Sequence, residues 1–333
     1  MTLDRRTLVL AGLAAPAIGG TVHAQSSLPI ADLPGPDEEI DLWPGTAPGM
    51  PAVPPHEVII DRSKDRAFQD RAVEHVARPR LAIFRAVRPN GAALLIAPGG
   101  GYQRVVVDKE GNELGRWLSA RGISAYVLTY RLPGDGWKAG PDVALADAQR
   151  AMRVIRARAR RDAVDPERVG VMGFSAGGHV CADLATRFAR AVYDPVDASD
   201  RLSARPFLAA PIYPVQSMHA PLAHPGSRAL LLGADASRAR ESAHTPAENV
   251  PSDAPPFFLC HAEDDATVPV GNTIDLRAAV RAQGIAVECH LFTEGGHGFG
   301  LRGVIGKPAG IWPELFLAWS RTRGFHGGHH PAA

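Results

Sequence analysis

Residues 168–179 read Arg-Val-Gly-Val-Met-Gly-Phe-Ser-Ala-Gly-Gly-His, and this stretch decides the fold. Its first half is apolar and rich in valine, which predicts a buried strand over 168–174, and a helical pattern follows over 176–189. Between them stands Ser175 in a G-x-S-x-G pattern, whose glycines remove the clashes that a sharp strand-to-helix turn would cause. Such a turn exposes the serine hydroxyl above the sheet and sets the next amides at a helix N-terminus. A Gly-Ser turn is common in α/β proteins, but the flanking strand and helix favour a nucleophilic serine.

The alternation of strand and helix continues on both sides of this stretch. Further apolar, β-rich runs lie at 57–60, 81–87, 92–97, 123–130, 207–211, 257–260 and 286–292. Helical patterns lie at 112–120, 144–161, 273–282 and 312–323. This order predicts an α/β fold with a mostly parallel, eight-stranded sheet that helices cover on both faces. The chemistry of such sheets collects at the carboxyl ends of the strands, and we expect the weakly periodic segment 214–256 to form a small lid or helix pair there.

Two late strands end in candidate partners for Ser175. A serine at its ordinary pKa is a weak nucleophile and needs a base that a third group holds in place. His297 follows the run 286–292 between two glycines and is the candidate base. Three neighbouring acids follow the run 257–260, and we expect one of them to orient the imidazole: Glu263, Asp264 and Asp265. Two other histidines, His261 and His290, lie in or beside strands and are interpreted as packing residues.

A glycine-rich loop, residues 98–102, follows the run 92–97 and reads Pro-Gly-Gly-Gly-Tyr. Three glycines allow close backbone approach and leave amides free to point at a developing negative charge. A phosphate cradle is the alternative, but neither G-x-x-x-x-G-K-[ST] nor G-x-G-x-x-G in a βαβ unit accompanies the loop.

The three cysteines stand far apart in the chain, so the sequence predicts no zinc site. Each cysteine lies in an apolar stretch and is expected to be a buried free thiol: Cys181, Cys260 and Cys289.

Composition narrows the classes of protein and partner. The chain has 333 residues, 45% hydrophobic and 21% charged, which argues against disordered, coiled-coil and collagen-like architectures. Its 36 basic and 35 acidic residues nearly cancel, so we expect no nucleic acid and no anionic membrane as partner. The helix 144–161 carries arginines opposite its apolar stripe: Arg150, Arg153, Arg156, Arg158, Arg160 and Arg161. No aromatic residues interleave with them, and this face is interpreted as solvated surface.

The N-terminal residues are expected to lie outside the folded domain. Residues 1–24 combine a basic start, a short apolar run and a small-residue cleavage pattern, which is typical of an export signal. The pair Arg5-Arg6 favours the twin-arginine type over the general secretion route. Eight prolines between residues 26 and 55 predict an N-terminal arm, 25–55, that is neither strand nor helix. The catalytic domain is then expected over 56–325 with a tail over 326–333, and no run is long enough to span a membrane.

Taken together, the motifs resemble the α/β-hydrolases, and more narrowly the bacterial carbohydrate acetyl esterases that are similar to acetyl xylan esterase. The resemblance covers roughly residues 80 to 320 and rests on the stretches 98–102, 130–132, 165–179, 213–215 and 295–300. It implies Ser175 as nucleophile and His297 as base. It implies Asp265 as the acid, because Asp265 matches the aspartate of the family pattern H-G-x-x-D-x-x-V-P, in which this chain has Ala262 for glycine.

The resemblance also implies that the amides of Gly100, Gly101 and Ala176 hold the oxyanion. Lipase-type relatives have histidine where this chain has Pro98, a change that leaves the backbone donors in place. Tyr102 is expected to offer a sugar-stacking surface, with a place in the core as the alternative.

The implied function is a serine esterase that removes acetyl groups from xylan-type polysaccharides or their oligosaccharides through an acyl-enzyme. The partner would be an acetylated carbohydrate, the setting polysaccharide degradation in the periplasm, and neither a metal nor an organic cofactor is implied. An esterase for other small or aromatic acyl groups, such as feruloyl esters, is the alternative among enzymes. A non-catalytic sugar-binding relative is the alternative among binding proteins, and it would be expected to lack one of the three catalytic side chains.

Overall fold

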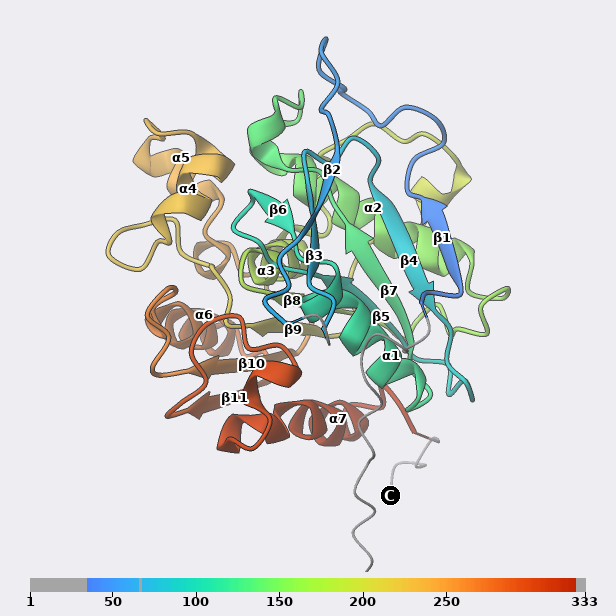
Figure 1. Cartoon of the computed structure of the whole chain (residues 1–333), viewed down its shortest axis with the longest axis vertical. Helices are drawn as coiled ribbons and strands as arrows, with labels where there is room; N and C mark the ends of the chain where they lie inside the picture. The colour runs from blue at the N-terminus through green and yellow to red at the C-terminus, as the bar shows by residue number, and fades with distance from the viewer. Residues whose placement is uncertain (1–34, 66–67, 328–333) are drawn as a thin grey trace, which may run out of the picture.

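The structure, a computed structural model, describes residues 35–65 and 68–327 (Figure 1). Eight strands form the main sheet in the order β1-β4-β7-β5-β8-β9-β10-β11. Their bounds are β1 Glu38–Asp41, β4 Arg80–Phe84, β5 Ala93–Ala97, β7 Ser124–Thr129, β8 Val169–Phe174, β9 Ala209–Ile212, β10 Phe257–Ala262 and β11 Val287–Phe292. The strands from β7 to β11 in this order run parallel, whereas β4 pairs antiparallel with both β1 and β7. The predicted mostly parallel, eight-stranded sheet is therefore confirmed.

One member of this sheet differs from the prediction. The run 57–60 corresponds to β2 (Val58–Asp61), which belongs to a separate antiparallel sheet with β3 (Arg71–Glu74) and β6 (Arg104–Val105). The eighth strand is instead β1, inside the arm that was expected to hold neither strand nor helix, and that expectation is wrong for residues 38–41. The reason is local, because no proline interrupts residues 37–43 and their amides remain free to pair with β4.

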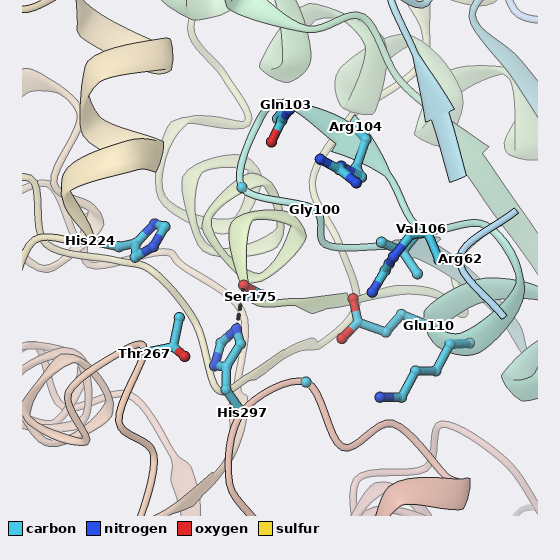
Figure 2. Close-up of a pocket in the computed structure, with 13 residues that line it drawn as sticks. Arg62, Gly100, Gln103, Arg104, Val106, Glu110, Ser175, His224, Thr267 and His297 are labelled. Carbon is cyan, nitrogen blue, oxygen red and sulfur yellow. Dashed lines mark hydrogen bonds between the residues drawn. The ribbon is translucent and has the colours of Figure 1, made fainter. Parts of the chain in front are cut away.

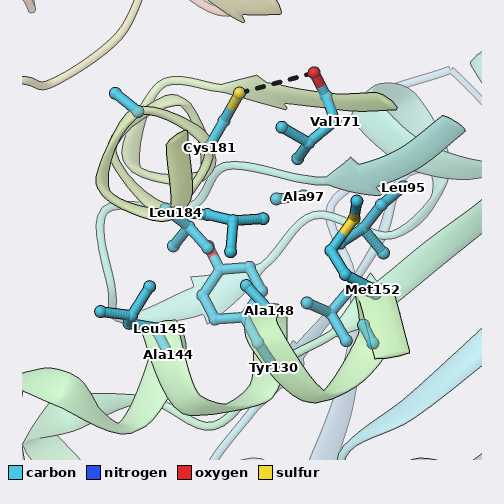
Figure 3. Packing of buried hydrophobic residues seen from close by; sticks show 14 of the residues in the cluster. Leu95, Ala97, Tyr130, Ala144, Leu145, Ala148, Met152, Val171, Cys181 and Leu184 are labelled. Atoms are coloured by element: carbon cyan, nitrogen blue, oxygen red, sulfur yellow. Dashed lines mark hydrogen bonds between the residues drawn. The ribbon is translucent and has the colours of Figure 1, made fainter. Parts of the chain in front are cut away.

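Helices cover both faces of the main sheet, as predicted. On one face lie α1 (Glu113–Ser119) and α7 (Trp312–Thr322). On the other lie α2 (Val143–Ala157), α3 (Ala176–Arg187) and α6 (Gly271–Ala282). Side chains of β5 alternate between the two layers: Leu95 packs toward α2 and α3 (Figure 3), and its neighbours Leu94 and Ile96 pack toward α1 and α7.

The arginine face of α2 is less solvated than expected. Arg150 is only 3% exposed, and its guanidinium forms an ion pair with Asp197 on a neighbouring loop. Arg156 donates to backbone carbonyls, and Arg158 donates to Glu38 at the start of β1. The interpretation of this face as solvated is wrong for Arg150, since the arginines tie α2 to the loops and the edge strand around it.

The segment 214–256 contains a helix pair, α4 (Pro225–Leu232) and α5 (Arg238–Ala243), as expected. All three cysteines are free thiols, buried at Cys181 and Cys260 and partly buried at Cys289. Within residues 35–65 and 68–327 no helix is long and apolar enough to cross a bilayer. The expected export signal and all but the start of the expected tail lie outside the described residues.

Candidate active site

The turn between β8 and α3 holds Ser175 in a strained backbone conformation. Its φ of 53° and ψ of −118° lie in a region that side chains rarely adopt, at a cost on the order of 1 to 3 kcal/mol. A Cβ at Gly173 would lie 2.0 Å from the carbonyl oxygen of Gly177, so the turn closes only with glycine there. The serine amide donates to the carbonyl of Ile212 at 3.1 Å, which anchors the turn to β9.

The structure brings together the serine, the histidine and one of the acids that the sequence analysis singled out. Nε2 of His297 lies 2.8 Å from Oγ of Ser175 (Figure 2). Nδ1 of the same ring lies 2.6 Å from Oδ2 of Asp265. A serine, an imidazole and a carboxylate in this order have the geometry of nucleophile, general base and orienting acid.

The neighbouring acids occupy other places. Oδ1 of Asp264 accepts the amides of Gly295 and Gly296 at 2.9 and 2.7 Å, so this carboxylate holds the loop that carries His297. Glu263 is exposed to solvent. The alternative between these acids is thus decided by geometry, because the imidazole pairs with Asp265.

Asp265 accepts four hydrogen bonds in a buried position. Oδ1 receives the amides of Thr267 and Val268, and Oδ2 receives Nε2 of His261 at 3.1 Å as well as Nδ1 of His297. Burial alone would raise the pKa of Asp265, but the bonds from the two histidines and the Val268 amide hold it well below its ordinary range. The carboxylate therefore stays charged, as the stabilisation of an imidazolium requires.

His261 has a role that its interpretation as a packing residue missed. It is fully buried at the end of β10, and its Nδ1 lies 2.8 Å from Oγ1 of Thr273 on α6. That contact, with the bond from Nε2, fixes the orientation of Asp265. The four-residue spacing between the histidine and the aspartate is the sequence signal that could have revealed it.

The glycine loop after β5 lies beside the serine. Gly100 and Gly101 have φ of +134° and +67°, and both line the pocket that contains Ser175. In the described part of the chain neither glycine donates its amide hydrogen to another group. Ala176 opens α3, where the first amides have no partner inside the helix. These three amides are available for an oxyanion formed on the serine.

A carboxylate that the sequence analysis did not identify holds this loop. Glu110 is 5% exposed, and its Oε2 accepts the amide of Gly99 at 2.8 Å. Its Oε1 accepts the hydroxyl of Tyr213 at 2.9 Å, and the tyrosine oxygen in turn accepts the amide of Gly300 at 3.0 Å. One side chain thereby links the glycine loop, the end of β9 and the loop of His297. It lies in the short helical turn Asp108–Asn112, outside any recognisable motif.

The pocket around Ser175 has a volume of about 310 Å³. His224, which caps the N-terminus of α4, lines it from the lid side (Figure 2). Nδ1 of His224 accepts the amide of Ser227 at 3.2 Å, which leaves the proton of the neutral ring on Nε2. Burial, with the neighbouring His297, lowers the pKa of His224 and favours this neutral form. The sequence analysis did not identify this residue, since its place depends on how the segment 214–256 folds.

The expectation that Tyr102 contacts a sugar is corrected. The side chain is 2% exposed, its hydroxyl lies 2.6 Å from Nδ1 of His179, and its ring meets that of Tyr130 edge-on. It is absent from the pocket wall because Gly101 and Tyr102 both have positive φ, 67° and 61°, and this turn directs the tyrosine into the core, the alternative that was also weighed.

The sequence of the chain is similar to that of known proteins. The BD-FAE family matches residues 92–280, more than half of the chain. The chain is 31% identical over 228 residues to the acetylxylan esterase of Xylanibacter ruminicola, which covers 67% of this chain and 44% of that protein. It is 30% identical over 227 residues to endo-1,4-beta-xylanase B of Butyrivibrio fibrisolvens. This match covers 68% of this chain and 34% of that protein. The chain thus spans less than half the length of these two curated relatives.

Solved structures show the same fold. The acetyl ester-xyloside bifunctional hydrolase from Caldicellulosiruptor lactoaceticus matches with a TM-score of 0.69 at 31% identity, covering 83% of this chain and 100% of that one. The carboxylesterase Cest-2923 from Lactobacillus plantarum matches with a TM-score of 0.62 at 22% identity, and the match covers 83% of this chain and 99% of that one. At this low identity the match supports the fold alone. The expected α/β-hydrolase fold and the resemblance to acetyl xylan esterases are confirmed, and the chain belongs to the BD-FAE family.

Proposed function

We propose that the protein is a serine esterase that removes acetyl groups from carbohydrates through an acyl-enzyme. The observation that carries the proposal is the line of hydrogen bonds from Ser175 through His297 to Asp265, set in an open pocket beside two free glycine amides. Similarity to an acetylxylan esterase and to an acetyl ester-xyloside hydrolase supports the choice of acyl group and of substrate class.

Acylation follows from the positions of the three side chains. The oxygen of Ser175 attacks the ester carbonyl carbon while its proton passes to Nε2 of His297. The amides of Gly100, Gly101 and Ala176 hold the resulting oxyanion. The negative charge of Asp265 stabilises the imidazolium and keeps the ring in the tautomer that can accept this proton.

Loss of the alcohol completes acylation, and deacylation then uses the same groups. When the tetrahedral intermediate collapses, Nε2 of His297 donates the proton taken from Ser175 to the sugar oxygen, which leaves as a hydroxyl. An acetyl group then remains on Ser175. Water, deprotonated by the same nitrogen, attacks this ester and releases acetate, after which the proton returns to the serine oxygen.

The test compares the purified protein with Ser175→Ala on p-nitrophenyl acetate, p-nitrophenyl butyrate, a feruloyl ester and acetylated xylan. We expect the native protein to release acetate from xylan and to prefer the acetyl over the butyryl ester. In the variant, kcat should fall by about 10⁵-fold, close to the background of the pocket alone. Equal rates for the two proteins would overturn the serine mechanism, and turnover of the feruloyl ester alone would overturn the acetyl specificity.

We also propose that the protein is exported to the periplasm by the twin-arginine route. The support is the basic start, the Arg5-Arg6 pair and the short apolar run of residues 1–24. Cell fractionation of the native chain and of the double variant Arg5→Lys, Arg6→Lys tests this. Esterase activity should move from the periplasmic to the cytoplasmic fraction in the double variant, and unchanged fractionation would overturn the proposed route.

A further inference from the structure

One wall of the pocket is rich in positive charge. Arg62, Arg104 and Lys109 all line it, whereas Glu110 is the one acid among the lining residues. Figure 2 shows Arg62 and Arg104 on one side of Ser175, with His224 on the other. The near-neutral net charge of the whole chain gives no reason for such an accumulation beside the nucleophile.

The cations of this wall are only loosely paired. The closest ion-pair contact of Arg62 is 3.7 Å, to Asp70, and that of Arg104 is 3.4 Å, to Glu74; both contacts are longer than a charge-assisted hydrogen bond. Lys109 is half-buried and has no ion pair within the described residues, although its charge acts on the carboxyl of Glu113. These three groups can therefore turn toward an incoming anion at little cost.

The single carboxylate of the wall does not cancel them. Both oxygens of Glu110 accept hydrogen bonds, from the amide of Gly99 and the hydroxyl of Tyr213, and the side chain is almost fully buried. These two hydrogen bonds stabilise the carboxylate group of Glu110, which is buried beneath the pocket surface. Of the charged side chains that line the pocket, the three cations are left to pair with an anion.

The position of the wall indicates which part of an ester it meets. The acyl carbonyl must direct its oxygen at the free amides of Gly100 and Gly101, and an acetyl group has no charge for a cation to recognise. The charged wall is therefore left for the alcohol part of the substrate. Guanidinium and ammonium groups bind carboxylate and sulfate through charge-assisted hydrogen bonds.

We propose that Arg62, Arg104 and Lys109 form a subsite for an anionic group on the alcohol part of the ester, so that acidic acetylated sugars are preferred over neutral ones. This inference rests on the proposed function, which it refines. The anion is a carboxylate, as in a uronic acid, or a sulfate, and matched substrates distinguish these sources.

The test uses monoacetates of four methyl glycosides that differ only at C6: the glucoside, its 6-sulfate, the glucuronate and the neutral methyl ester of the glucuronate. We expect kcat/KM to be about three- to fivefold higher for the anion that the subsite accepts, as for a partly exposed ion pair. The preference should decline as ionic strength rises from about 0.02 to 0.5 M, because the Debye length shortens over this range. Equal kcat/KM for charged and neutral substrates at low salt would overturn the subsite, while loss of activity on all four would overturn the proposed function instead.

Variants assign the preference to the wall. Arg104→Gln and Lys109→Gln should each lower the ratio of acidic to neutral kcat/KM, and Lys109→Glu should lower it further. Arg281→Gln is the matched control, because Arg281 lies on α6 and lines a different hollow. Its ratio should equal that of the native protein. Two outcomes would overturn the subsite: the preference for acidic substrates persists in all the wall variants, or Arg281→Gln removes it as well. Either outcome would mean that the electrostatic field of the whole protein causes the preference.

Discussion

Ser175 stands between two buried carboxylates, Glu110 toward the glycine loop and Asp265 toward the histidine loop. They are 5% and 7% exposed, and each accepts hydrogen bonds on both oxygens. Each also joins segments that are far apart in the sequence. The two side chains are nearly equal in burial, although Asp265 accepts four hydrogen bonds and Glu110 two.

Their donors make the difference. Asp265 receives an imidazole, His297, that in the proposed mechanism gains and loses a proton in each cycle, so the charge of Asp265 would stabilise the imidazolium. Glu110 receives a backbone amide and the hydroxyl of Tyr213, neither of which changes charge. We infer that Asp265 acts through its charge and Glu110 through the positions it imposes, and substitutions can separate the two effects.

Among substitutions of these acids and their neighbours, the largest effect is expected for Asp265→Asn, which should lower kcat on p-nitrophenyl acetate by roughly 10⁴-fold with little change in KM. An asparagine can hold the ring of His297 but favours the tautomer that cannot accept the serine proton. Asp264→Asn is the matched control, since its amide oxygen can still accept the loop amides. A loss below tenfold in Asp265→Asn would contradict the assigned charge role.

A smaller effect is expected for Glu110→Gln, a fall in kcat of roughly 10- to 30-fold, below the loss of a whole oxyanion donor. Glutamine has one acceptor oxygen and cannot receive both Gly99 and Tyr213, so the glycine loop loses part of its support. The shape of the pH–rate profile should remain that of the native protein. Tyr213→Phe removes part of the same link, so the double variant should lose less than the product of the two single losses. Independent, multiplicative losses would argue against a shared link.

Asp265 also makes the stability of the fold depend on pH. The pKa of Asp265 in the folded protein lies below its ordinary value of 3.8, so its ionisation stabilises the fold above about pH 4 and this contribution is lost as the pH falls. The native protein should therefore lose more unfolding free energy between pH 6 and pH 3 than Asp265→Asn, by on the order of 1 kcal/mol. Thermal unfolding at the two pH values measures the difference. If the native protein and Asp265→Asn lost the same unfolding free energy between the two pH values, the four hydrogen bonds to the carboxylate would contribute nothing to stability.

The smallest effect is expected for Asp264→Ala, which should lower kcat about threefold. The change leaves the amides of Gly295 and Gly296 to solvent and loosens the loop of His297, but an exposed loop can recover those bonds from water. Steady-state kinetics on p-nitrophenyl acetate beside Asp264→Asn tests this, because the asparagine should restore the native rate. A loss as large as that in Asp265→Asn would mean that the two neighbouring acids share one role.

The contrast also explains what could be predicted from the sequence. Ser175, His297 and the group of acids stand at strand ends inside glycine-rich patterns, so local rules were enough to find them, and the α/β-hydrolase sheet followed from strand and helix periodicity. Glu110 and His224 reach the pocket only through the packing of distant segments, and no local pattern marks them. Tyr102 was misplaced because the direction of its side chain depends on the positive φ of both Gly101 and Tyr102 itself, which no local sequence rule predicts for a tyrosine.

The arm shows the same limit at the scale of a strand. Eight prolines in thirty residues predict irregular structure, yet the proline-free interval 37–43 pairs with β4 and places Trp43 in the core, where its indole donates to Asp147 at 2.7 Å. The proline content of the whole arm does not show this short interval. Pairing with β4 needs only the few proline-free residues that the partner strand can reach.

Strand β1 gives the main sheet a short edge in which three of the four residues are acidic, a composition that disfavours pairing with another chain. It occupies the outer side of β4, whose amides and carbonyls would otherwise form an open edge able to recruit a strand from another molecule. Arg158 fastens it there through Glu38. A protease that trims the chain beyond residue 44 would leave Ser175 and its partners intact but uncover that edge, so the trimmed protein should aggregate before it loses its catalytic geometry.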